Sequence, residues 1–154
     1  MASRILVVDD EPSIVKLVKA TLESRGYDIA EAFDGQEALV QVKLHKPDLI
    51  LLDIMMPRMD GTEVRRRLLA DPETKDIPVI HLSAVGDFDK QRQAMAEGVT
   101  DYIVKPFTPS DLAQRVSDML DPKKQAQVKK DHDHKAAQLR AITDIMARKR
   151  ESGA

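Results

Sequence analysis

The chain lacks cysteine and tryptophan, and only 3% of its 154 residues are aromatic. Without cysteine it can form no disulfide, no cysteine nucleophile and no thiolate metal site. No run approaches the roughly 18 consecutive apolar residues of a membrane-spanning helix. The first apolar run, residues 5–8, is too short for the apolar region of a signal peptide. We therefore expect a cytoplasmic protein that makes no contact with a membrane.

Acidic and basic residues are unevenly distributed along the chain. Residues 1–120 carry 15 Lys and Arg against 21 Asp and Glu, whereas residues 121–154 carry 9 against 5. An acidic body lacks the basic surface by which proteins bind nucleic acids, so we expect no direct nucleic-acid binding. The composition, with 42% hydrophobic residues, is that of an ordinary globular domain.

Short apolar runs alternate with segments of helical periodicity. The runs cover residues 5–8, 49–52, 79–82 and 102–104, with a weaker one at 27–30, and the first is rich in β-branched residues. The helical segments run from Pro12 to a stop at Gly26, from Gly35 to a stop at Pro47, and over residues 61–70, 88–97 and 109–120. Runs that are apolar on both faces are typical of parallel strands covered by helices. The pattern predicts an α/β fold, a (βα)5 doubly wound parallel sheet.

The chain changes character after this alternation. Asp121 and Pro122 form a helix start signal, and residues 123–150 contain neither Gly nor Pro. We predict one domain over residues 1–121 and a C-terminal helical extension over residues 122–154.

The extension carries only a weak apolar stripe. At the spacing of a coiled coil its seam would consist of Val128, His132, Lys135, Leu139, Ile142 and Met146. Three interpretations remain open: a helix that packs on a partner or a second copy, a linker of a longer protein, or a solvated extension without a role.

Polar side chains follow four of the predicted strands, namely Asp9, Asp10, Asp53, Ser83 and Lys105. In open α/β sheets, ligands bind beyond the carboxyl ends of the strands, so these groups should converge. Three neighbouring carboxylates raise one another's pKa values, and a hard cation such as Mg²⁺ relieves the conflict. One carboxylate can then act as a nucleophile, with the ammonium and the hydroxyl binding oxygens of an incoming phosphoryl group.

Five motifs surround these groups, at residues 5–11, 48–57, 59–61, 82–84 and 101–107. Together they resemble the receiver domain of two-component response regulators, the CheY-like family. The resemblance covers residues 3 to about 120 and implies a flavodoxin-like sheet of strand order 2-1-3-4-5.

The resemblance also implies the chemistry of the site. Asp53 would accept a phosphoryl group from a phosphohistidine on a sensor histidine kinase or a phosphotransfer protein. The implied ligands of Mg²⁺ are the carboxylates of Asp10 and Asp53, the backbone carbonyl of Met55 and, through a water molecule, Asp9.

Other residues match the family's switch. Lys105 and Ser83 would bind phosphoryl oxygens, and Tyr102 would turn inward as Ser83 moves. The bond from Lys105 to Pro106 is typically cis in this family. The output surface would comprise the helix over residues 88–97, the strand after it and the helix over residues 109–120. A homodimer could form through that surface or through the C-terminal helix.

Two positions that modulate phosphoaspartate lifetime in such domains are Met55 and Val85 here. Both are apolar and offer no group to position an attacking water, so we expect slow self-dephosphorylation.

Two alternatives remain for the function. A Mg²⁺-dependent phosphohydrolase of the haloacid-dehalogenase type needs a second aspartate two residues after its nucleophile, where this chain has Met55. We therefore expect a phosphoacceptor rather than an enzyme that turns over small substrates. A docking module that is never phosphorylated is the other alternative.

Overall fold

A computed structural model of the protein contains one parallel sheet and five helices in the part of the chain that it describes. The described residues are 2–84, 86, 88–96, 101–122, 124, 134, 137–138, 141–142 and 144–146. The strands are β1 (Arg4–Val8), β2 (Asp28–Ala32), β3 (Leu49–Asp53), β4 (Val79–Ala84) and β5 (Asp101–Lys105). The helices are α1 (Pro12–Glu23), α2 (Gly35–His45), α3 (Gly61–Ala70), α4 (Phe88–Ala96) and α5 (Pro109–Leu120).

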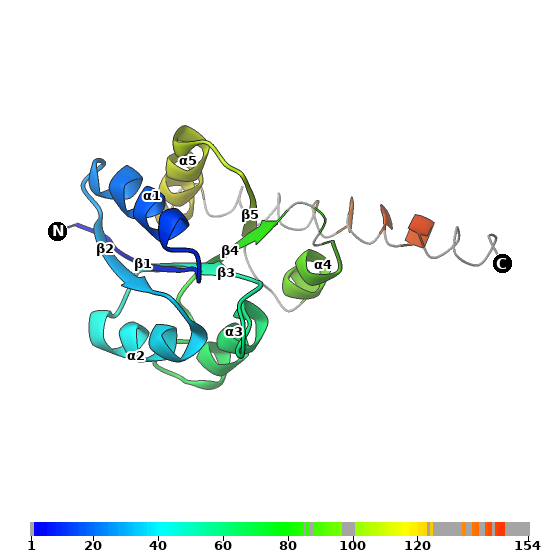
Figure 1. The fold of residues 1–154 in the computed structure, drawn as a ribbon, viewed down its shortest axis with the longest axis horizontal. Coiled ribbons are helices and arrows are strands. Elements are labelled where there is room, and N and C mark those ends of the chain that lie inside the picture. The colour runs from blue at the N-terminus through cyan, green and yellow to red at the C-terminus, as the bar shows by residue number, and fades with distance from the viewer. Residues whose placement is uncertain are drawn as a thin grey trace.

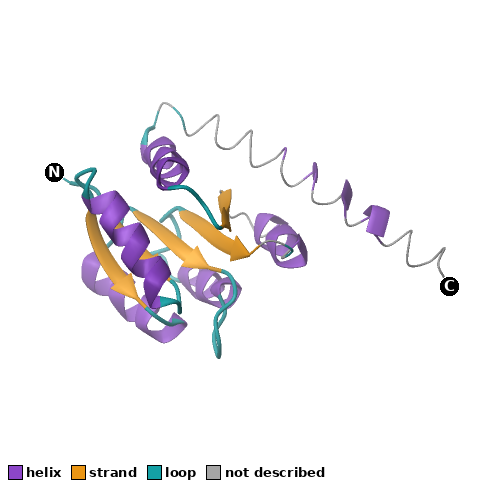
Figure 2. Ribbon diagram, turned by 45° about the horizontal axis from the view of Figure 1, so that its top comes forward, coloured by secondary structure: helices purple, strands orange, loops and turns teal. Residues whose placement is uncertain are grey.

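The strands pair in the order β2-β1-β3-β4-β5, and every pair is parallel. Helices α1 and α5 cover one face of the sheet, and α2 and α3 cover the other (Figures 1 and 2). Helix α4 lies toward the β4–β5 end of the sheet (Figure 1). The predicted α/β fold and its strand order are therefore confirmed.

Alternate residues of the central strands enter two separate hydrophobic cores. Leu6 and Ile50 point into the core under α2 and α3, whereas Ile5 and Leu49 point into the core under α1 and α5. Because successive side chains of a strand point to opposite faces, a strand that is buried on both sides must be apolar at every position. This explains why β1 and β3 appear in the sequence as continuous apolar runs.

Local signals fix the starts of the helices. Pro12 occupies the first turn of α1, where its missing N–H is not needed. The side chain of Asp34 accepts a hydrogen bond from the backbone N–H of Glu37 at 2.7 Å, which caps α2. Asp60 caps α3 in the same way, through the N–H of Glu63 at 2.9 Å.

The predicted boundaries of α3 and α5 agree with the structure at both ends. The prediction for the second strand, residues 27–30, was wrong at both ends, because β2 begins at Asp28 and continues to Ala32. Its extra length comes from pairing with β1, in which Val7 lies opposite Glu31 and Val8 opposite Ala32.

The predicted C-terminal helix lies mostly outside the described residues, as do Val85, Val128, His132, Lys135 and Leu139. Residues 134, 137–138, 141–142 and 144–146 are helical where they are described. Among them, Ile145 and Met146 expose 53% and 42% of their surface. Among the described residues, no helix is long and apolar enough to cross a membrane.

Candidate functional site

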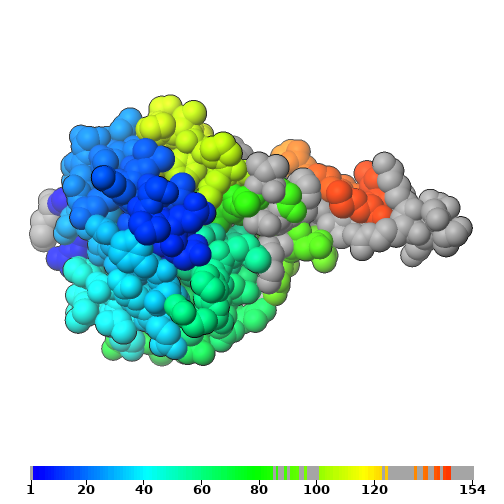
Figure 3. Space-filling view, in the orientation of Figure 1, coloured from blue at the N-terminus to red at the C-terminus, as the bar shows by residue number. Residues whose placement is uncertain are grey.

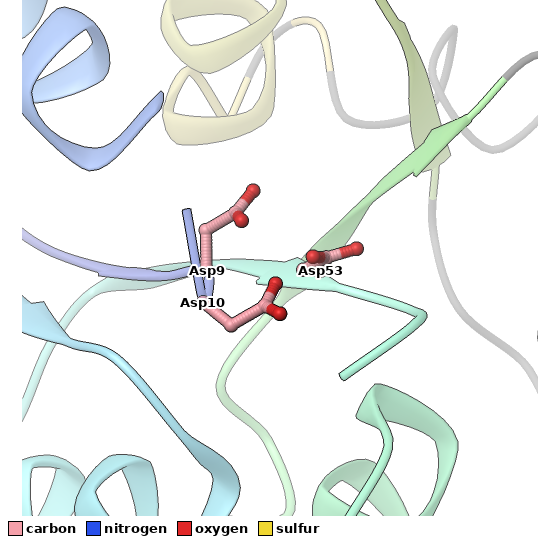
Figure 4. Close-up of side chains that lie close together, drawn as sticks. All are labelled: Asp9, Asp10 and Asp53. Atoms are coloured by element: carbon pink, nitrogen blue, oxygen red, sulfur yellow. The ribbon is translucent and has the colours of Figure 1, made fainter. Parts of the chain in front are cut away.

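Three aspartates meet where β1 and β3 end. Val8 and Leu52 are register partners in the sheet, so Asp9 and Asp53 extend side by side from neighbouring strands. One carboxylate oxygen from each of Asp9, Asp10 and Asp53 lies within 4.8 Å of the others. Figure 4 shows the three carboxylates around a common space. The predicted convergence of these residues is observed.

The three carboxylates differ in their exposure. Asp9 is fully buried and Asp53 is 4% exposed, whereas Asp10 is open to solvent. Burial, followed by the charge of Asp9, raises the pKa of Asp53 from 3.8 to about 7, although Lys105 and the backbone N–H of Met55 act in the opposite direction. Burial and the neighbouring carboxylate of Asp9 therefore disfavour the charged form of Asp53, even beside Lys105.

Lys105, at the end of β5, is the cation of this cluster. Its Nζ lies 2.6 Å from Oδ2 of Asp9, 3.4 Å from Oδ2 of Asp53 and 3.6 Å from Oε1 of Glu11. Burial alone would lower the pKa of Lys105, but the hydrogen bond to Asp9 and the charges of Asp53 and Asp9 raise it above its usual range. The bond from Lys105 to Pro106 is cis, as the resemblance implies.

Backbone groups hold the carboxylates in place. The N–H of Glu11 donates to Oδ1 of Asp9 at 3.0 Å, and the N–H of Met55 donates to Oδ1 of Asp53 at 3.1 Å. These bonds leave the other oxygen of each carboxylate directed at Lys105. Met55 itself is half exposed at the rim.

Gly61 allows α3 to begin directly against the phosphoacceptor candidate. Its N–H donates to the carbonyl oxygen of Ile54 at 2.8 Å. A Cβ at this position would collide with the backbone carbonyl oxygen of Asp53. The sequence analysis noted the motif at residues 59–61 but missed this steric role, which only the packing of α3 against β3 reveals.

Ser83 lies on β4, one residue beyond Leu82, the register partner of Asp53. It is fully buried, and its Oγ accepts a hydrogen bond from Nε2 of Gln91 on α4 at 2.8 Å. Tyr102, on the neighbouring strand β5, is half-buried against the core under α2 and α3. Burial, together with the charge of Asp101, raises the pKa of Tyr102. Sequence reasoning missed Gln91, because nothing local marks which helical glutamine faces inward.

The site is assembled from distant parts of the chain. In the space-filling view, blue segments from the start of the chain lie against green segments from its middle (Figure 3). The geometry brings Asp9, Asp10, Asp53 and Lys105 together in one cluster. Such a cluster can hold a hard cation beside a nucleophilic carboxylate and can neutralise an incoming anion.

Curated relatives match about three-quarters of the chain. A transcriptional regulator from Synechocystis, named as the DNA-binding dual master transcriptional regulator RpaA, is 42% identical over 76% of this chain and 48% of its own. The phosphate regulon transcriptional regulatory protein PhoB of Pseudomonas aeruginosa is 45% identical over 75% of this chain and 51% of its own. The chain thus spans about half the length of the curated relatives it matches.

Solved structures of response regulators are similar to the chain over about the same share of its length. The chemotaxis response regulator CheY4 of Vibrio cholerae is 32% identical, with a TM-score of 0.71 over 76% of this chain and 98% of that one. A response regulator receiver domain protein from Clostridium thermocellum is 31% identical, with a TM-score of 0.72 over 79% of this chain and 97% of that one. The family model of the response regulator receiver domain matches residues 5–117. The chain therefore belongs to the response regulator receiver domain family.

Proposed function

We propose that Asp53 is the phosphoacceptor of this receiver and takes its phosphoryl group from a phosphohistidine on a histidine kinase or a phosphotransfer protein. The observation that carries the proposal is the buried Asp53 carboxylate, which has two further aspartates within 4.8 Å and a lysine Nζ at 3.4 Å. A buried acid in such a setting is a candidate for chemistry rather than for surface solvation.

The donor set fits Mg²⁺, which prefers oxygen ligands and retains several waters. We propose that Asp10 and Asp53 bind it through their carboxylates, Met55 through its backbone carbonyl and Asp9 through a water molecule. The raised pKa of Asp53 supports this assignment, because burial and then the charge of Asp9 disfavour its charged form, and Lys105 only partly offsets them. A bound Mg²⁺ would offset the negative charge of the aspartates and allow the anionic phosphoryl group to approach the carboxylate of Asp53.

In the proposed reaction, an oxygen of Asp53 attacks phosphorus and the bond from phosphorus to the donor histidine nitrogen breaks. Lys105 would then exchange its contact with Asp9 for one with a phosphoryl oxygen, because the phosphoryl group brings the larger negative charge. The hydroxyl of Ser83 would donate to another oxygen, and Tyr102 would turn inward to report the change. We expect slow hydrolysis, since Met55 offers no base or amide for an attacking water.

We also propose that residues 1–121 form the receiver and that residues 122–154 form a helical extension that contacts a partner or a second copy. We propose no turnover of small substrates, because Met55 stands where a phosphohydrolase would need a second aspartate. We propose no direct nucleic-acid contact, because residues 1–120 are acidic. We propose that the exchange takes place in the cytoplasm, where kinases that form phosphohistidine obtain ATP.

Incubation with Mg²⁺ and acetyl phosphate, followed by measurement of intact mass, tests the proposal. A stable gain of one phosphoryl group in the wild type, lost in Asp53→Asn, is the expected result. The amide is nearly isosteric but is a poor nucleophile. Steady release of phosphate without an adduct would instead support a phosphohydrolase, and neither adduct nor release would support a docking module.

A further inference from the structure

A buried hydrogen bond joins the phosphorylation site to α4. Gln91 on α4 is 3% exposed and Ser83 on β4 is fully buried, and Nε2 of Gln91 lies 2.8 Å from Oγ of Ser83. Glutamine is mostly an exposed residue, so a buried one is expected to have a specific polar partner. The partner here is the hydroxyl that follows Leu82, the register neighbour of Asp53.

The direction of this bond leaves the hydroxyl hydrogen of Ser83 available. A serine hydroxyl donates one hydrogen bond and can accept two. Because the amide of Gln91 donates, Ser83 uses only a lone pair of its oxygen in this contact. The same hydroxyl can therefore donate to a phosphoryl oxygen on Asp53 while it still accepts from Gln91.

We propose that Gln91 is a positioning residue that acts through Ser83. Its amide orients the hydroxyl of Ser83 toward a phosphoryl group on Asp53 and so connects α4 to that group. The inference rests on the proposed phosphoacceptor function and adds to it a direct side-chain connection from the site to α4. Figure 1 shows α4 at the end of the sheet where β4 lies.

The first test is affinity for beryllofluoride, a phosphoryl mimic, in the presence of Mg²⁺, measured by calorimetry. Gln91→Met keeps the length and burial of the side chain but removes the donor. We expect it to weaken binding roughly three- to tenfold, the range of one ordinary hydrogen bond. Gln36→Met, on the exposed surface of α2, is the matched control and should bind as the wild type does.

A double-mutant cycle separates positioning from simple packing. If Gln91 acts through Ser83, Gln91→Met should weaken binding in the wild-type background but not in a Ser83→Ala background. Equal losses in both backgrounds would overturn the proposal, because they would show that Gln91 matters without the hydroxyl. Unchanged binding of Gln91→Met in the wild-type background would overturn it too.

A measurement on the unaltered Gln91 does not depend on the folding of that variant. The side-chain amide resonance of Gln91 in an NMR spectrum should shift when beryllofluoride and Mg²⁺ are added, and Ser83→Ala should shift it in the free protein. A resonance that stays in place on addition of the mimic would overturn the proposal. If the wild type binds no beryllofluoride and accepts no phosphoryl group, both the proposed function and this inference fail, whereas binding without a shift removes only the inference.

Discussion

Replacing Asp53 by asparagine should stabilise the metal-free protein at high pH. Burial and the charge of Asp9 raise the pKa of Asp53 from 3.8 to about 7. The folded state therefore holds a proton that the unfolded state has already lost, so the free energy of unfolding falls as pH rises from about 4 to 7. The full difference corresponds to at most ~4 kcal/mol, at about 1.4 kcal/mol for each pH unit. The asparagine side chain does not ionise, so Asp53→Asn should not show this fall in the free energy of unfolding.

The assay is urea unfolding in the presence of a chelator, at about pH 5 and at about pH 8. Asp53→Asn should exceed the wild type by about 1–2 kcal/mol at the lower pH and by about 3–4 kcal/mol at the higher, so that the gap widens by about 2–3 kcal/mol between them. Asp89→Asn, on the exposed surface of α4, controls for the general effect of removing a negative charge. Added Mg²⁺ should restore stability to the wild type at the higher pH, because it binds only the folded site.

The reasoning would be refuted if the wild type and Asp53→Asn lost the same stability between the two pH values. It would also be refuted if Asp53→Asn were the less stable protein at the higher pH.

Three further predictions concern the remaining parts of the site and the tail. Lys105→Ala removes the ammonium that lies 3.4 Å from Asp53. It should raise the pKa of Asp53 further in the metal-free protein, as followed by NMR titration, and an unchanged pKa would contradict the contact. Asp10→Asn should weaken Mg²⁺ binding in calorimetry more than Asp9→Asn does, since the exposed Asp10 is the proposed direct ligand. A larger loss in Asp9→Asn would contradict the assignment of Asp10 as the direct ligand. Truncation after Asp121 should lower the molar mass seen by light scattering at high concentration, because Ile145 and Met146 are exposed apolar side chains that a second copy could cover. Equal, monomeric masses for both chains would contradict self-association.

Much of the fold could be predicted because the signals are local. Asp60 and Gly61 mark the start of α3, and Pro109 marks the start of α5, so both helices were placed correctly. The second strand was misplaced because its ends depend on pairing with β1, which no local pattern encodes. In particular, Glu31 belongs to β2, and its carboxylate lies 2.6 Å from Nζ of Lys19 on α1.

The candidate site could be predicted as a set of residues but not as an environment. The ends of the apolar runs located Asp9, Asp10, Asp53 and Lys105. The sequence could not show that Asp9 is buried while its neighbour Asp10 is exposed, since burial depends on distant parts of the chain, such as Lys105, which lies 2.6 Å from Asp9. The bond between Gln91 and Ser83 was missed for a similar reason, because it forms only when α4 folds onto β4.

The identity of the phosphorylated residue tests the whole account. Borohydride reduces an aspartyl phosphate to homoserine, which marks its position for peptide mass mapping. After treatment with acetyl phosphate and Mg²⁺, we predict homoserine at residue 53 and at no other aspartate of the chain. A homoserine at Asp9 or Asp10, or a phosphorylated protein with Asp53 intact, would contradict the assignment of Asp53 as the phosphoacceptor.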